Sequence, residues 1–194
     1  WLINLLHSNV KTMSCRLCDF HDTILVTAKV YNSEVKKSSA DQPNFQFLRT
    51  RVIQLWSLFP SFCNGRVTDI SGNFERFVPI LQGAMDDAMY PELLYHAVGG
   101  LTFLAKGAKE RCPALARVVA LERSGDAAAA SAASSLTPEI LTLRKFASQF
   151  VPSIVTRIES LDASDNSRFQ PLLQCISAWT SIAPQNLITK LSKK

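Results

Sequence analysis

The residues with the greatest potential for chemistry lie near the amino end, where Cys15-Arg-Leu-Cys18-Asp-Phe-His21 places two thiols and an imidazole within seven residues. Such side chains could bind zinc, but a structural zinc site takes four ligands. No second Cys-x-x-Cys or His-x-x-x-His follows, and Cys63, Cys112 and Cys175 stand singly. We therefore expect reduced cysteines in ordinary helices, with no metal site and no cofactor.

The other polar residues form no pattern typical of an active site. The histidines His7, His21 and His96 have no nucleophile motif beside them. The sequence has neither a Gly-x-x-x-x-Gly-Lys phosphate loop nor a dinucleotide-binding Gly-x-Gly-x-x-Gly. Because catalysis needs several converging polar groups, we predict that the protein is not an enzyme and has no small-molecule substrate.

Basic residues offer a different kind of chemistry, the binding of phosphate groups. The 194 residues include 21 Lys and Arg against 16 Asp and Glu, and the excess lies mainly in residues 111–194. A pI near 9.1 permits attraction to phosphate-rich partners. The candidate contacts with RNA or another partner lie at predicted loops and helix ends: Lys36, Lys37, Lys106, Lys109, Arg111, Lys190, Lys193 and Lys194. The alternative is that these side chains only complement helix dipoles.

The elements that position these residues are predicted to be helices, because apolar residues recur with a 3.6-residue period and no convincing strand appears. Residues 45–59 form one apolar helix face, and we expect Pro60 to end that helix. Gly99-Gly100 interrupts the helix that begins at Pro91, which predicts tight packing of a neighbouring helix at that point. The last helix has an apolar face of Phe169, Leu172, Leu173, Ile176, Trp179, Thr180 and Ala183.

The composition sets further limits on the class of protein. Hydrophobic residues make up 47% of the chain and charged residues 19%, which excludes disorder for the chain as a whole. No uninterrupted apolar run approaches the ~20 residues that a bilayer span requires, so we expect no contact with a membrane. The sequence begins at Trp1 without an initiator Met or a signal peptide, which indicates a fragment of a longer protein.

The helices form pairs that start near Phe45, Pro91 and Pro138, and these spacings of 46 and 47 residues match or slightly exceed the ~40–47 residues of two-helix solenoid repeats. We predict an all-α fold, an α-solenoid of HEAT/armadillo-like helical hairpins within a longer array, in preference to a compact helical bundle. The predicted divisions are an N-terminal helical pair in 1–35, a loop in 36–44, HEAT-like repeats in 45–123, an Ala/Ser-rich flexible linker in 124–135 and a C-terminal helical pair in 136–194.

One segment is similar to a known family. The run Arg51-Val-Ile-Gln-Leu-Trp56-Ser-Leu-Phe-Pro60-Ser-Phe-Cys63, followed by Thr68-Asp69, resembles a Gln-x-Trp-Ser-Leu-x-Pro-x-Phe-Cys segment of the ribosomal RNA-processing protein 12 family. The resemblance extends over about residues 45–107. The matching residues include Ser57 and a set that we interpret as structural core: Gln54, Trp56, Leu58, Pro60, Phe62, Cys63 and Asp69.

This resemblance implies a HEAT-repeat scaffold of the nucleolus and nucleus that shuttles to the cytoplasm. Such a protein would associate with pre-ribosomal RNA and small-subunit assembly proteins, and would support ribosomal RNA processing, small-subunit assembly and nuclear export. Karyopherins also stack helical pairs, so a karyopherin-like transport adaptor that binds protein cargo is the alternative.

Overall fold

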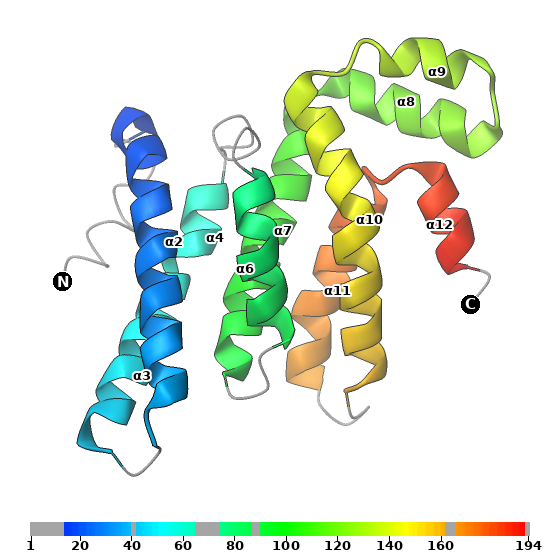
Figure 1. Ribbon diagram of the computed structural model, residues 1–194. Helices are drawn as coiled ribbons and strands as arrows, with labels where there is room; N and C mark the ends of the chain where they lie inside the picture. Colours follow the sequence, from blue (N-terminus) through cyan, green and yellow to red (C-terminus); the bar gives the residue numbers. More distant parts are fainter. Residues whose placement is uncertain (1–13, 40–41, 65–73, 87–89, 162–165, 193–194) are drawn as a thin grey trace. The chain divides into compact units, whose positions relative to one another are not determined.

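The computed structural model describes residues 14–39, 42–64, 74–86, 90–161 and 166–192. Within these ranges the regular structure is entirely helical and no strand occurs, so the all-α prediction is confirmed. The helices are labelled in Figure 1: α2 (Ser14–Lys37), α3 (Pro43–Trp56), α4 (Leu58–Cys63), α6 (Phe74–Asp86), α7 (Pro91–Arg111), α8 (Pro113–Ser124), α9 (Ala128–Ala133), α10 (Pro138–Glu159), α11 (Asn166–Thr180) and α12 (Gln185–Leu191).

The described residues divide into two compact units. Unit 1 comprises the described parts of Trp1–Asn64 and Glu75–Gly100, and unit 2 comprises those of Gly65–Phe74 and Leu101–Lys194. The division falls inside α7, whose first ten residues belong to unit 1 and whose remaining residues belong to unit 2. Each unit is therefore described by itself.

In unit 1, α2 and α3 lie side by side as a helical hairpin (Figure 1). The hairpin buries an apolar seam of Leu25, Ala28, Val35, Phe45 and Val52. Helix α2 continues to Lys37 and α3 begins at Pro43, so the loop is shorter than the predicted 36–44. Lysines are compatible with a last helical turn, where they face the negative end of the dipole, and proline is favoured at the first helical position.

The prediction that Pro60 ends a helix is wrong. Helix α3 already ends at Trp56, and Pro60 lies in the first turn of the next helix, α4. A proline fits there because the first-turn amides of a helix have no intrahelical acceptor. Pro79 and Pro152 lie inside α6 and α10, which continue on both sides of them.

In unit 2, α8 and α9 pack together as a short hairpin (Figure 1). Gly125 ends α8 in the left-handed conformation, with φ of 71°. The segment 124–135, for which we predicted an Ala/Ser-rich flexible linker, contains the short helix α9. Alanine is the strongest helix former, and the Asp126 carboxylate accepts a 2.8 Å hydrogen bond from the amide of Ala128 at the helix start.

The second hairpin of unit 2 pairs α10 with α11, which lie side by side in Figure 1. Its interior holds the indole of Trp179 from α11, with the ring of Phe150 from α10 centred 5.7 Å away. Both side chains are completely buried. Aromatic residues at this spacing add favourable edge and face contacts to their burial, so this pair anchors the hairpin.

Candidate functional site

The segment that resembles the ribosomal RNA-processing protein 12 family forms the end of α3 and the whole of α4. Its buried side chains include Trp56, Leu58, Phe59, Phe62 and Cys63. Gln54 and Pro60 are partly exposed, and Asp69 lies outside the described residues. The Trp56 indole and the Phe59 ring pack edge to face, with ring centroids 6.0 Å apart and an interplanar angle of 70°. This segment is therefore an internal part of unit 1 rather than an exposed surface.

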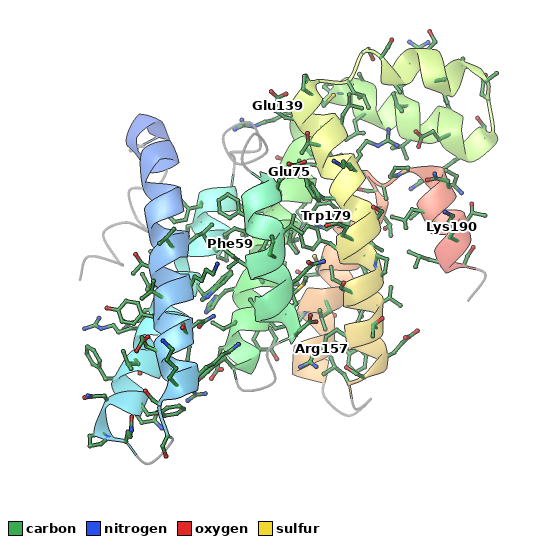
Figure 2. The ribbon with its side chains drawn as sticks, in the orientation of Figure 1. Phe59, Glu75, Glu139, Arg157, Trp179 and Lys190 are labelled. Atoms are coloured by element: carbon green, nitrogen blue, oxygen red, sulfur yellow. The ribbon has the colours of Figure 1, made fainter. Side chains whose placement is uncertain are left out.

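The segment packs directly onto the two glycines of α7. A Cβ atom added at Gly100 would lie 2.3 Å from two ring atoms of Phe59 and 3.1 Å from the sulfur of Cys63. At Gly99 it would lie 3.3 Å from Cγ of Pro60. Figure 2 shows the Phe59 side chain, and its ring centre lies 6.3 Å from that of Phe77 on α6. The expected close approach of a neighbouring helix at Gly99-Gly100 is confirmed.

The first half of α7 is also tied to α3 by charge. The guanidinium of Arg49 forms a 2.8 Å ion pair with Glu92, which lies in the first turn of α7. The same guanidinium lies 5.8 Å from the centre of the buried Tyr90 ring. A carboxylate in the first turn also faces the positive end of the helix dipole, so Glu92 is favourably placed for both reasons.

The predicted basic contacts are exposed wherever the structure describes their side chains. Lys36 and Lys37 end α2 in unit 1, and Lys37 forms a 2.9 Å ion pair with Glu34. In unit 2, the second half of α7 carries Lys106, Lys109 and Arg111. Lys190 lies on α12 (Figure 2). Lys193 and Lys194 lie outside the described residues. The candidate contacts therefore come from helices of both units.

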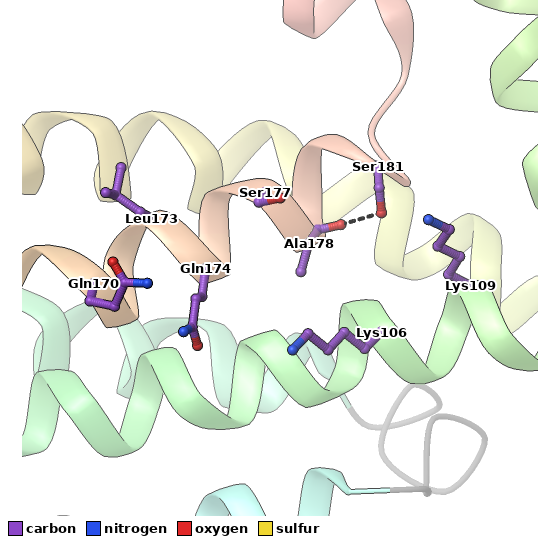
Figure 3. A pocket seen from close by; sticks show the side chains of 8 residues that line it. All are labelled: Lys106, Lys109, Gln170, Leu173, Gln174, Ser177, Ala178 and Ser181. Atoms are coloured by element: carbon purple, nitrogen blue, oxygen red, sulfur yellow. Dashed lines mark hydrogen bonds between the residues drawn. The ribbon is translucent and has the colours of Figure 1, made fainter.

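Two of these lysines line a groove of unit 2 between α7 and α11, shown in Figure 3. The groove has a volume of about 520 Å³. Lys106 and Lys109 form one side of it. The other side is formed by α11 and the residue that follows it, through Gln170, Leu173, Gln174, Ser177, Ala178 and Ser181. The groove is therefore basic on one side and mainly polar and uncharged on the other.

Contacts behind the groove fix how α11 is rotated against α7. The indole N–H of Trp179 donates a 3.0 Å hydrogen bond to the backbone carbonyl of Leu101. Cys175, one turn earlier, is buried and hydrogen-bonds the side chain of Thr102. Desolvation by burial raises the pKa of the Cys175 thiol to about 12. Because Trp179 and Cys175 face α7, the polar residues of α11 that line the groove lie beside Lys106 and Lys109.

A buried ion pair holds the adjoining part of unit 2. Arg144 of α10 is almost fully buried, and its Nη2 lies 2.8 and 2.6 Å from the two carboxylate oxygens of Glu122 on α8. Its Nε donates a 2.9 Å hydrogen bond to the carbonyl of Ile182. The amide of Gln185, the first residue of α12, donates to the same carboxylate at 3.3 Å. This network joins α8, α10 and the start of α12 within unit 2.

No cluster of three or more metal-binding side chains is present among the described residues. Cys15, Cys18 and His21, whose spacing could suit zinc, lie in the first turns of α2. Cys63 is completely buried in unit 1, and burial raises the pKa of its thiol well above the ordinary value. A thiol held neutral in this way is a packing group rather than a nucleophile.

Comparison with protein families identifies the chain. The family model described as ribosomal RNA-processing protein 12, HEAT repeats, matches residues 1–156. The chain belongs to this family. Comparison with curated proteins and with solved structures gave no match. The match includes the whole segment from Gln54 to Cys63 and extends well beyond the 45–107 over which the resemblance was visible in the sequence.

Membership of the ribosomal RNA-processing protein 12 family agrees with the helical hairpins of the structure, and confirms the prediction of an all-α solenoid of HEAT repeats. The family acts in ribosomal RNA processing and ribosome biogenesis, is nucleolar and is of the scaffold type. In the part of the chain that the structure describes, none of the helices is both long enough and apolar enough to cross a bilayer.

Sequence reasoning missed the α11 side of the groove. It placed Leu173 on the apolar inner face, whereas in the structure this residue is 47% exposed and is one of those that line the groove. The polar residues opposite the lysines follow a helical stripe of their own: Gln170, Gln174, Ser177 and Ser181. Their i, i+4, i+7, i+11 spacing was a usable signal, because residues so spaced share one helix face.

Proposed function

We propose that this chain is a non-enzymatic α-solenoid scaffold that binds pre-ribosomal particles and supports ribosomal RNA processing, small-subunit assembly and nuclear export. The observation that carries the proposal is the match to the ribosomal RNA-processing protein 12 HEAT repeats over residues 1–156. Its partners would be pre-ribosomal RNA and small-subunit assembly proteins. It would be found in the nucleolus and nucleus and would shuttle to the cytoplasm.

The distribution of buried and exposed residues supports a scaffold. The interiors of both units are apolar, and the buried charged or polar side chains among the described residues are Thr102 and Arg144, which have partners within the protein. The exposed basic residues lie at helix ends and along the second half of α7. Stacked helical repeats bind partners through extended exposed surfaces of this kind.

The proposal is tested by capturing the tagged chain from nuclear extract, with and without ribonuclease treatment, and sequencing the RNA that is recovered. We expect enrichment of precursors of the small-subunit ribosomal RNA together with small-subunit assembly proteins. Ribonuclease should release the part of the associated material that is held by RNA. The same capture with an unrelated basic helical-repeat protein measures enrichment due to charge alone.

Recovery of folded cargo proteins and a small GTPase of the Ran type, without ribosomal RNA precursors, would instead support the transport adaptor and refute the scaffold.

A second test is the salt dependence of binding to purified RNA. Phosphate contacts by lysines predict a steep loss of affinity as salt rises, since each neutralised phosphate releases counterions. A flat salt dependence would contradict a role for the basic residues.

A further inference from the structure

The groove of unit 2 has the composition of a surface that binds a polyanion. Lys106 and Lys109 are exposed, and neither ammonium has a hydrogen-bond or ion-pair partner among the described residues. No acidic side chain is among the described residues that line the groove. The unpaired ammonium groups of Lys106 and Lys109 give one side of the groove a positive potential, which favours the binding of an external anion.

The opposite side of the groove supplies hydrogen-bond donors without adding charge. The side-chain amides of Gln170 and Gln174 and the hydroxyl of Ser177 line it, whereas the Ser181 hydroxyl already donates to the carbonyl of Ala178 at 2.6 Å (Figure 3). Amide and hydroxyl groups donate to phosphate and ribose oxygens. A ligand in the groove would therefore meet cations on one flank and neutral donors on the other.

We propose that this groove binds the sugar–phosphate backbone of a single-stranded segment of RNA, without preference for its sequence. The inference deepens the proposed scaffold function, on which it rests, by assigning one contact surface for RNA. Lys106 and Lys109 are three residues apart on one helix face, with Cβ atoms separated by about 5–6 Å. Their long side chains can thus reach neighbouring phosphates of the same strand.

The size of the groove favours one strand over a duplex. A volume of about 520 Å³ falls within the ~300–1,000 Å³ range of pockets that hold drug-sized ligands, which corresponds to a short stretch of a strand. Recognition of double-stranded RNA instead spans about 16 base pairs across successive grooves. The exposed part of Leu173 adds an apolar patch on which the face of an unstacked base or ribose can rest.

The chemistry also favours RNA over an acidic segment of a protein. Lysine binds phosphate as a point charge, and the cations that line this groove among the described residues are Lys106 and Lys109. A nucleic acid strand carries one charge per nucleotide at a regular interval, which suits cations at a fixed helical spacing.

The test measures binding of the intact 194-residue chain to a fluorescent single-stranded RNA of about 12 nucleotides, by anisotropy, across ~50 to ~200 mM salt. The test variant is Lys106→Gln/Lys109→Gln. Its matched control is Lys29→Gln/Arg117→Gln, which removes the same charge from two exposed residues outside the groove. We expect the test variant to lose about tenfold in affinity and the salt slope to fall by ~1.4, at ~0.7 per phosphate, with a smaller effect in the control.

A second variant, Gln174→Glu, places a carboxylate in the groove at an exposed position, where folding is little affected. It should also weaken RNA binding, while circular dichroism shows the wild-type helical signal. Wild-type affinity in Lys106→Gln/Lys109→Gln, or equal losses in the control, would overturn the proposal. So would tighter binding of a glutamate-rich peptide than of RNA, because the groove would then suit an acidic protein segment.

These outcomes are separable from a failure of the proposed function. If capture from nuclear extract recovers ribosomal RNA precursors but the groove variants bind RNA like the wild type, the scaffold stands and the groove assignment fails. If the groove variants lose RNA binding but the wild-type chain recovers no ribosomal precursors, the groove assignment stands and the scaffold fails.

Discussion

Replacing Gly100 by alanine tests how closely α4 packs against α7. The added Cβ would lie 2.3 Å from Cδ1 and Cε1 of Phe59 and 3.1 Å from the sulfur of Cys63. Carbon atoms pack best at about 3.5–4.0 Å. The Phe59 ring must therefore move by roughly 1 Å or more, or α4 and α7 must separate. The Phe59 ring is buried between Trp56 and Phe77, which leaves it little room to move.

The expected magnitude follows from two opposing effects. Overpacking a well-filled interior costs about 1–3 kcal/mol, and two ring atoms at this distance place Gly100→Ala at the upper end of that range. Alanine in the middle of a helix recovers up to about 1 kcal/mol relative to glycine. The net destabilisation is therefore about 2 kcal/mol, which lowers the melting temperature of a chain of this size by about 4–8 °C.

The chain offers a matched control in Gly83, which lies in α6 and has nothing within 4 Å of an added Cβ. Gly83→Ala should be stabilising by about 0.5–1 kcal/mol, because only the helix propensity changes. At Gly99 the added Cβ would lie 3.3 Å from Cγ of Pro60, so the change in stability for Gly99→Ala should lie between those for Gly100→Ala and Gly83→Ala.

The assay is thermal unfolding followed by the helical signal in circular dichroism. Combining Gly100→Ala with Phe59→Leu should cost less than the sum of the two single substitutions, since the smaller side chain vacates part of the overlap. If Gly100→Ala melts at or above the temperature of Gly83→Ala, the reasoning is refuted, and α4 does not lie against α7 in solution.

Three further predictions use the same unfolding assay. Trp56→Phe should cost about 1 kcal/mol less than Trp179→Phe, because only the Trp179 indole donates a hydrogen bond, and equal costs would contradict this. Arg144→Ala should destabilise by about 3–5 kcal/mol since it leaves the Glu122 carboxylate without its cation, whereas the exposed Arg117→Ala should change stability by less than about 0.5 kcal/mol. The pKa of the Cys175 thiol is raised from 9.0 to about 12 in the folded protein, so its contribution to stability is complete below pH 9 and is lost progressively as pH rises to 12. Between these pH values, the free energy of unfolding of Cys175→Ala should therefore fall less steeply with pH than that of the wild type. An unchanged slope would contradict the raised pKa of Cys175.

Local signals in the sequence were sufficient to predict the helices and one of their contacts. The apolar period identified α3, α7, α10 and α11, and Pro91 and Pro138 were correctly placed at helix starts. Gly99-Gly100 predicted a close approach, because a pair of glycines inside a helix is costly unless another group fills the space. Such signals depend on residues within one or two turns of each other.

The break between α3 and α4 could not be predicted from the same information. Pro60 is compatible both with the end of one helix and with the first turn of the next. We attribute the choice to packing, because Phe59 and Cys63 of α4 lie directly against Gly100 of α7. That contact joins segments that lie about 40 residues apart in the sequence.

The groove escaped prediction for a similar reason. The apolar residues of α11 cover more than one face of the helix, so the sequence alone did not determine which of them face inward. The hydrogen bond from Trp179 to the carbonyl of Leu101 decides it, and it joins residues 78 positions apart. With that rotation fixed, Leu173 is exposed and Gln174 lies opposite the lysines.

The segment that identifies the family and the surface proposed to bind RNA therefore have different physical roles. Trp56, Leu58, Phe62 and Cys63 are buried in unit 1, so they cannot contact a partner without unfolding it. The resemblance thus reports how α4 packs against α7, and the affinity for a partner must come from exposed residues elsewhere. Among the described residues, the groove formed by Lys106 and Lys109 with α11 meets that requirement, because it combines unpaired cations, neutral donors and an exposed apolar patch within a single unit.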